Sequence, residues 1–239
     1  RDIVLEIPPP LLGGPNRTES NAIHPIYLKG DLYPWSGFRQ EVINHWQSYP
    51  WRAMPAALAA QTFPPTTATT NTEFVYAADE NGLQDRWNQN IGQIMGVVFD
   101  SQRMDMRLAD FKANLSDCTE VLDSVICTTG GQAIAVGEFT VFWVDSHEFQ
   151  IAEYMAALGL KHGYLSIYNQ TIFLKVEVPA GKRYTGLFYS DVINRSDTSV
   201  TLRQAFFYFA IKTRSDIYHT VQISRNAQWT VTGKKFVNT

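Results

Sequence analysis

Two acidic residues interrupt apolar, strand-like runs of this chain. Asp123 lies within the run 121–128, and Glu138 lies within the run 133–143. The intervening Thr-Gly-Gly at 129–131 suits a hairpin turn, which would place the two residues on neighbouring strands. Burying a carboxylate is unfavourable unless it is hydrogen-bonded, paired or bound to a metal. The pattern therefore predicts either a shared divalent cation, with Mg²⁺ as the candidate because it prefers oxygen ligands, or two edge acids that point to solvent.

The periodicity around this hairpin predicts an α/β domain with a mixed central β-sheet flanked by helices. Apolar residues recur at helical spacing over 80–98, where Asp79 can cap the helix, and over 147–158. We expect a helix over 201–212, capped by Ser199 or Thr198, although its aromatic run also suits a strand. Further strands are expected at 162–168, 171–178, 184–189, 220–224 and 228–232.

The first part of the chain has a different composition. Prolines and a Thr-rich connector interrupt regular structure there, so only two short helices are expected, at 38–46 and 55–61. Its tyrosines and tryptophans are too numerous to remain in water, so this segment should cover the main domain or a partner. The predicted organisation is an irregular extension at 1–71 followed by one domain at 72–239.

Charge and hydropathy limit the classes of partner. The formal net charge of −3 argues against a protein whose whole surface binds nucleic acid. From Lys175 onward, however, the chain has ten Lys and Arg residues but only four Asp and Glu residues. This excess of positive charge is compatible with phosphate binding or with a solvated basic face. No apolar run reaches the roughly 18 residues that span a bilayer, so we expect a soluble protein without a membrane partner.

The two acids also lie in motifs that resemble a known family. Leu122-Asp123 and, after fourteen intervening residues, Glu138-Phe-Thr140 resemble the signature of the PD-(D/E)XK nuclease superfamily, in which an Asp, an acidic residue and a Lys define the site. The stretch 136–143 (VGEFTVFW) is similar to the GE-hydrophobic-KTPW strand of fungal PD-(D/E)XK nuclease-like proteins. Three later stretches are similar to that family's Q-A-Y-M and following block: 150–155 (QIAEYM), 159–166 (GLKHGYLS) and 168–175 (YNQTIFLK). The resemblance covers about 80–212.

The resemblance implies a restriction-endonuclease-like core and a set of site residues. Asp123 and Glu138 would be the metal-binding acids, with Mg²⁺ as the cofactor if the site is retained. Gln150 and Tyr154 match the Gln-x-x-x-Tyr pattern of the exonuclease branch, in which both side chains line the site. An acidic residue of the first helix is often a further ligand, and the candidates here are Glu80 and Asp85.

The chain departs from the family at one catalytic position. Thr140 stands where the motif has lysine, and the apolar pair Val141-Phe142 follows it. The lysine stabilises charge that develops at the reacting phosphate, and loss of such a group lowers the rate by about 10²–10³. The resemblance therefore predicts a catalytically degraded nuclease that acts as a binding or interaction module, such as a fungal effector-type or regulatory protein.

Two alternatives remain open at this stage. The chain could be an active Mg²⁺-dependent nuclease whose lysine comes from elsewhere, with Lys112 and Lys161 as candidates. It could also be a purely structural domain with vestigial acids. The expected partner is a protein or a nucleic acid, contacted through the basic part from Lys175 onward, and the expected location is the cytoplasm, the nucleus or the inside of a host cell.

Overall fold

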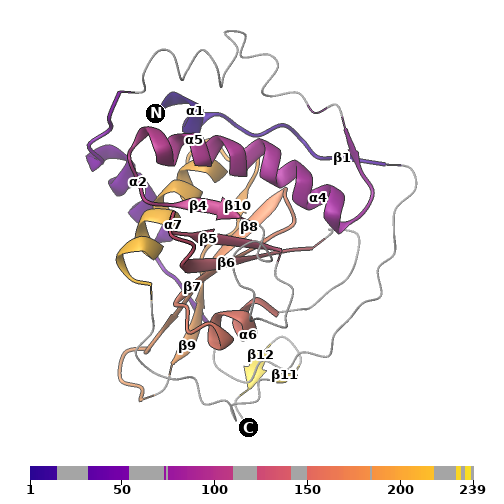
Figure 1. Cartoon of the computed structure of the whole chain (residues 1–239). Coiled ribbons are helices and arrows are strands. Elements are labelled where there is room, and N and C mark those ends of the chain that lie inside the picture. The colour runs from indigo at the N-terminus through magenta and orange to yellow at the C-terminus, as the bar shows by residue number, and fades with distance from the viewer. Residues whose placement is uncertain are drawn as a thin grey trace.

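The computed structural model of the chain describes residues 1–14, 32–53, 73, 75–109, 123–140, 150–183, 185–217, 230–232 and 235–237. Its centre is an eight-stranded mixed sheet with helices on both faces (Figure 1). In chain order the elements are α1 (Asp2–Leu5), β1 (Leu12–Gly13), β2 (Leu32–Pro34), α2 (Phe38–Ser48), β3 (Tyr76–Ala77), α4 (Glu80–Trp87), the π-helical turn η1 (Asn88–Gly92), α5 (Gln93–Ser101), β4 (Arg107–Ala109), β5 (Ser124–Cys127), β6 (Ala133–Phe139), α6 (Gln150–Ala157), β7 (His162–Ser166), β8 (Gln170–Glu177), β9 (Gly186–Tyr189), β10 (Ile193–Asn194), α7 (Leu202–Ser215), β11 (Thr230–Thr232) and β12 (Lys235–Val237). The predicted α/β class is confirmed.

The main sheet has the strand order β2-β9-β8-β7-β6-β5-β4, and β10 also pairs with β8. The pairs β6–β7 and β2–β9 are parallel, and the remaining pairs are antiparallel. Parallel neighbours require a crossover, and α6 lies in the connection between β6 and β7. The expected hairpin at 129–131 is confirmed, since it joins the antiparallel strands β5 and β6.

Two hydrophobic cores lie on opposite faces of the sheet. The larger one packs α1, α2, α4, α5 and α7 against the sheet, and the smaller one packs α6 against it. Every residue of α7 from Leu202 to Ala210 is buried, which explains why this stretch is apolar apart from Arg203 and Gln204. The helical interpretation of 201–212 is therefore confirmed over the strand alternative.

The cap predicted for α7 is wrong. Thr201 directly precedes the helix, and its Oγ1 accepts the backbone N–H of Gln204 at 3.1 Å, while the Gln204 side chain accepts the N–H of Thr201. Because the helix begins at Leu202, Thr198 and Ser199 lie too far upstream to occupy the capping position.

The predicted helix at 80–98 forms and extends to Ser101, with the π-helical turn η1 in its middle. Asp79 caps it as expected, since its Oδ1 accepts the N–H of Gly82 at 2.8 Å. The predicted helix at 55–61 and the strand at 220–224 lie outside the described residues, and so does the expected start of α6 at 147. Strand 228–232 is described only as β11.

Residues from the first part of the chain belong to the main core. Strand β2 pairs in parallel with β9 at an edge of the sheet, and the Phe38 ring of α2 stacks on Phe173 of β8 at 5.1 Å. Trp35 and Trp46 are also buried in this core. Trp35 and Trp46 are among the tyrosines and tryptophans that the sequence predicted to be covered. Across the described residues, no helix combines the length and apolar character needed to cross a bilayer.

Candidate metal centre

Three carboxylates converge at one place in the fold. Asp123 directly precedes β5, Glu138 is the penultimate residue of β6, and Glu80 opens α4. One carboxylate oxygen from each residue lies within 4.8 Å of the other two, and all three residues are partly buried. The structure thus brings together the two acids that were expected to meet and, of the two helix candidates, Glu80.

The β5–β6 hairpin places Asp123 beside Glu138. The antiparallel register pairs Ser124 with Gly137, so the next pair outward is Asp123 with Glu138. The Oδ2 atom of Asp123 accepts the backbone N–H of Phe139 at 2.7 Å. This bond fixes one carboxylate oxygen against the neighbouring strand.

Helix α4 is tied to the same hairpin. The side-chain Nε2 of Gln84 donates a hydrogen bond to the backbone carbonyl of Asp123. Gln84 follows Glu80 by four residues, so the two side chains occupy one face of the helix. Gln84 therefore holds the helix that carries Glu80 against the strand that carries Asp123.

A glycine and a tyrosine support the hairpin from the main core. A Cβ atom on Gly137 would lie 2.2 Å from Cζ of Tyr164, so only glycine fits under this ring. The Tyr164 hydroxyl donates to Oγ of Ser124 at 2.9 Å, and the Trp87 ring stacks on Tyr164 at 5.4 Å. Burial raises the pKa of Tyr164, which keeps this donor protonated. Sequence reasoning missed Gln84 and Tyr164, whereas Gly137 carried a usable signal, since a glycine within a strand often marks a close approach.

Thr140 continues the strand that carries Glu138. Its N–H donates to the carbonyl of Ser166 at 3.2 Å, which extends the β6–β7 ladder beyond Phe139. Alternate residues of an extended chain lie on the same side, so position 140 lies on the same side of this strand as Glu138. A lysine here would place an ammonium group on that side, whereas the threonine hydroxyl is neutral.

Lys161, one of the two candidates for a displaced lysine, pairs with a different acid. Its ammonium group forms an ion pair with Asp216 at 2.5 Å. It also precedes Leu165, the register partner of Glu138, by four residues, which is about 13 Å along a strand. Lys112, the other candidate, lies outside the described residues.

The expected Gln150 and Tyr154 pair is described only in part. Helix α6 begins at Gln150, but the side chain of Gln150 lies outside the part of the chain that the structure describes. Tyr154, one turn later, is partly buried and packs against the smaller core.

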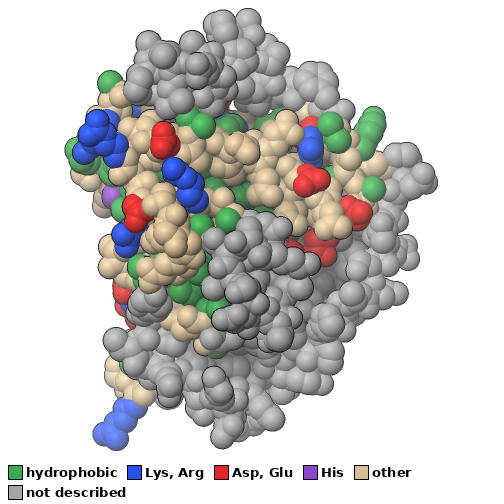
Figure 2. Space-filling view, viewed as in Figure 1, with side chains coloured by type: hydrophobic (Ala, Val, Ile, Leu, Met, Phe, Trp, Pro, Cys, Tyr) green, Lys and Arg blue, Asp and Glu red, His purple; other side chains and the backbone are tan. Residues whose placement is uncertain are grey.

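The donor atoms suit a hard divalent cation. Oxygen ligands around octahedral Mg²⁺ lie about 2.1 Å from the ion and hence about 3–4 Å from one another, close to the spread of the three carboxylates here. The group of three offers only oxygen donors, which favours Mg²⁺ or Mn²⁺ over zinc. Figure 2 shows acidic side chains gathered around the start of α4.

The basic residues from Lys175 onward do not act as one free strip. Four of the side chains that the structure describes make internal contacts: Lys175 with Glu177, Arg195 with the carbonyl of Pro8, Arg203 with the carbonyl of Asn90, and Arg214 with Asp105. Arg203 is fully buried. The count of positive residues therefore overstates the charge that this region presents to phosphates.

Comparisons of this chain with protein-family models, with curated proteins and with solved structures found no match.

Proposed function

We propose that this chain is a PD-(D/E)XK nuclease-like domain that binds a divalent cation and nucleic-acid phosphates but has lost efficient cleavage. The motif resemblance between about 80 and 212 is one support. A second support is the order of elements along the chain. Helix α4–α5 is followed by the strands β4, β5 and β6, then by α6, and then by β7, which is parallel to β6. This order agrees with a restriction-endonuclease-like core.

The convergence of Glu80, Asp123 and Glu138 is the observation that carries the proposal. The three acids come from a helix start and from two strands, and separate contacts of Gln84 and Phe139 support their arrangement. Carboxylates this close repel one another, and a cation bound between them offsets this repulsion because it attracts all three. When bound, Mg²⁺ would supply a positive centre that takes phosphate oxygens as further ligands.

The loss of cleavage follows from position 140. A phosphoryl transition state needs stabilisation beyond the metal, and the motif lysine supplies it as a fixed positive charge. Thr140 offers a hydroxyl group without charge. The chain should therefore retain metal-dependent binding while cleavage falls by about 10²–10³.

Binding and cleavage are measured separately to test this function. We expect Mg²⁺ or Mn²⁺ to strengthen binding of fluorescent DNA or RNA oligonucleotides by the full chain, and Asp123→Ala to abolish that increase. We expect no cleavage above background by the unmodified chain. Thr140→Lys should raise metal-dependent cleavage about tenfold or more, whereas Thr140→Met, of similar length and without charge, should not. An unmodified chain that shows no metal-dependent binding would overturn the proposal.

An active nuclease is the second candidate, and the retention of all three carboxylates favours it. In that case the unmodified chain cleaves nucleic acid in Mg²⁺, and both Asp123→Ala and Glu138→Ala abolish the reaction. Lys112 is then the first lysine to replace, because Lys161 is committed to Asp216. Loss of cleavage in Lys112→Met, with metal binding retained, would identify the displaced lysine.

A further inference from the structure

Residues 1–14, here called the strap, are held through their backbone by distant side chains. Figure 1 shows the strap running from α1 alongside α5 and α4 to β1. Four of its carbonyl groups accept side-chain hydrogen bonds: Ile3 from Arg203 at 3.0 Å, Val4 from Thr201 at 2.7 Å, Pro8 from Arg195 at 2.6 Å and Pro9 from Tyr168 at 2.8 Å. The strap is therefore attached to the main domain at four points along its backbone.

The anchors of the strap also hold the helix that carries Glu80. Arg203 is fully buried, and its Nη2 donates to the carbonyl of Asn90 in η1 at 2.8 Å. The Asn90 side chain in turn donates to the Tyr168 hydroxyl at 2.9 Å. Polar groups buried in this way depend on one another, because a lost partner leaves a desolvated group behind.

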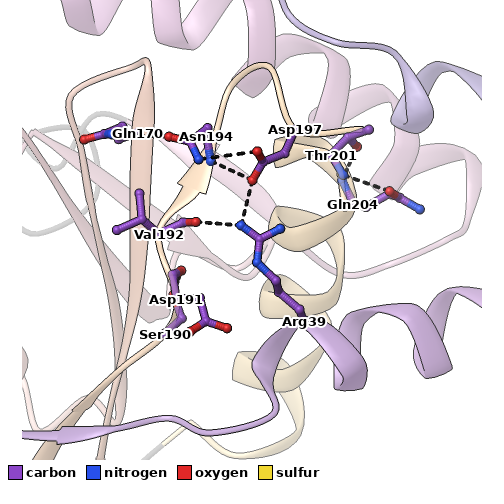
Figure 3. Close-up of polar contacts among 9 residues, drawn as sticks. All are labelled: Arg39, Gln170, Ser190, Asp191, Val192, Asn194, Asp197, Thr201 and Gln204. Atoms are coloured by element: carbon purple, nitrogen blue, oxygen red, sulfur yellow. Dashed lines mark hydrogen bonds and ion pairs between the residues drawn. The ribbon is translucent and has the colours of Figure 1, made fainter. Parts of the chain in front are cut away.

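The loop that presents Arg195 is itself fixed. Arg39 of α2 forms an ion pair with Asp197 at 2.6 Å and donates to the carbonyl of Val192 at 2.7 Å (Figure 3). Asp197 also accepts the N–H of Asn194 at 3.0 Å. The loop that carries Arg195, a donor to the strap, is thus held in place by α2.

The far end of the strap reaches the start of α4. Strand β1 pairs in parallel with β3, with Leu12 opposite Tyr76 and Gly13 opposite Ala77. The N–H of Gly14 then donates to the carbonyl of Ala77 at 2.9 Å. Only one residue separates Ala77 from the capping Asp79, and Glu80 follows directly.

We propose that the strap is a positioning element for the metal centre, which sets the place of Glu80 by pairing with β3. This inference rests on the proposed function. Asp123 and Glu138 are held by the pairing of β5 with β6. Glu80 instead lies in the first turn of α4, and β3, the strand that precedes this helix, pairs with β1. Undocking the strap releases β3 and the first turn of α4, so the cation keeps two carboxylate ligands and loses the third. By linkage, a bound cation stabilises the docked strap to the same extent.

The test targets the hydrogen bond at the end of the strap. Gly14→Pro removes the N–H that bonds to Ala77, and Gly14→Ala keeps it, so the pair separates the bond from added bulk. Calorimetric titration with Mn²⁺ alone should show an affinity about fivefold or more lower for Gly14→Pro than for Gly14→Ala. Hydrogen exchange of the full chain should show that Mn²⁺ slows exchange at residues 1–14, and that Glu80→Gln removes this protection.

The second measurement excludes a merely structural role for the strap. A strap that only stabilised the fold would be insensitive to Mn²⁺, and its exchange would not depend on the carboxylate of Glu80. Equal Mn²⁺ affinities for the two Gly14 variants, or metal protection that persists in Glu80→Gln, would overturn the inference and leave the proposed function intact. Absence of Mn²⁺ binding by the unmodified chain would overturn both.

Discussion

The buried imidazole of His162 gives this fold a specific sensitivity to acid. His162 opens β7 and has no exposed surface, and neither ring nitrogen has a hydrogen-bond partner within the described residues. Its neighbours are the rings of Trp35 at 6.4 Å and Phe209 at 5.9 Å. This apolar burial lowers the pKa of His162 to about 3, helped by the positive charges of Lys161, Lys212 and Lys175 and opposed by Asp216.

The direction of the pH effect follows from that pKa. An unfolded histidine titrates near 6.5, so between about pH 6.5 and pH 3 the unfolded chain binds a proton that the folded chain does not. The free energy of unfolding therefore falls as the pH drops below 6.5. The contribution of His162 to this fall between pH 7 and pH 4.5 is about 2–3 kcal/mol.

Urea denaturation at pH 7 and pH 4.5 measures this contribution when the unmodified chain is compared with His162→Leu. Leucine fills a similar volume and cannot be protonated, so the variant should lose about 2–3 kcal/mol less stability between the two pH values. His45→Leu is the matched control, because His45 is only half-buried and burial lowers its pKa less. Parallel pH profiles for the unmodified chain and His162→Leu would refute the reasoning.

Two further predictions concern the residues around the carboxylates. Gly137→Ala should destabilise the fold by about 3 kcal/mol, because its Cβ would overlap the buried Tyr164 ring, which Trp87 and Phe206 hold in place; thermal unfolding checks this, and an unchanged melting temperature would contradict it. Glu138→Gln should stabilise the metal-free chain by about 1–3 kcal/mol, since it removes repulsion among carboxylates within 4.8 Å, and it should reduce the stabilisation that Mg²⁺ gives. A melting temperature that shifts equally with and without Mg²⁺ would exclude a shared cation.

Much of the central fold was predictable because local signals agreed with it. The apolar runs on either side of the glycine-containing turn at 129–131 favoured a hairpin, and the helical spacing over 80–98 had a capping aspartate in front of it. The register of that hairpin then places Asp123 beside Glu138. This part of the candidate site was accessible from the sequence because it depends on contacts close in sequence.

The rest depended on contacts between distant segments. From sequence alone, an arginine such as Arg203 is expected to point into solvent. In the structure it is buried and donates to carbonyl groups of η1 and of the strap. The pairing of β1 with β3 joins two segments of two residues each, too short for a periodic signal. The choice between Glu80 and Asp85 also required the orientation of α4 against β5, which the Gln84 contact shows and which periodicity cannot give.

Under the proposed function, the three acids and the neutral residue at position 140 have different consequences for metal binding and for cleavage. Three partly buried carboxylates within 4.8 Å of one another oppose folding of the metal-free chain, through desolvation and mutual repulsion. A domain released from every demand on this site would gain stability by replacing any one of them. Under the proposed function, in contrast, a neutral residue at position 140 lacks a charge needed only for cleavage and would leave cation binding unimpaired. The presence of these unfavourable carboxylates, without the charge that the motif lysine would supply, supports the proposed metal-dependent binding over the purely structural alternative.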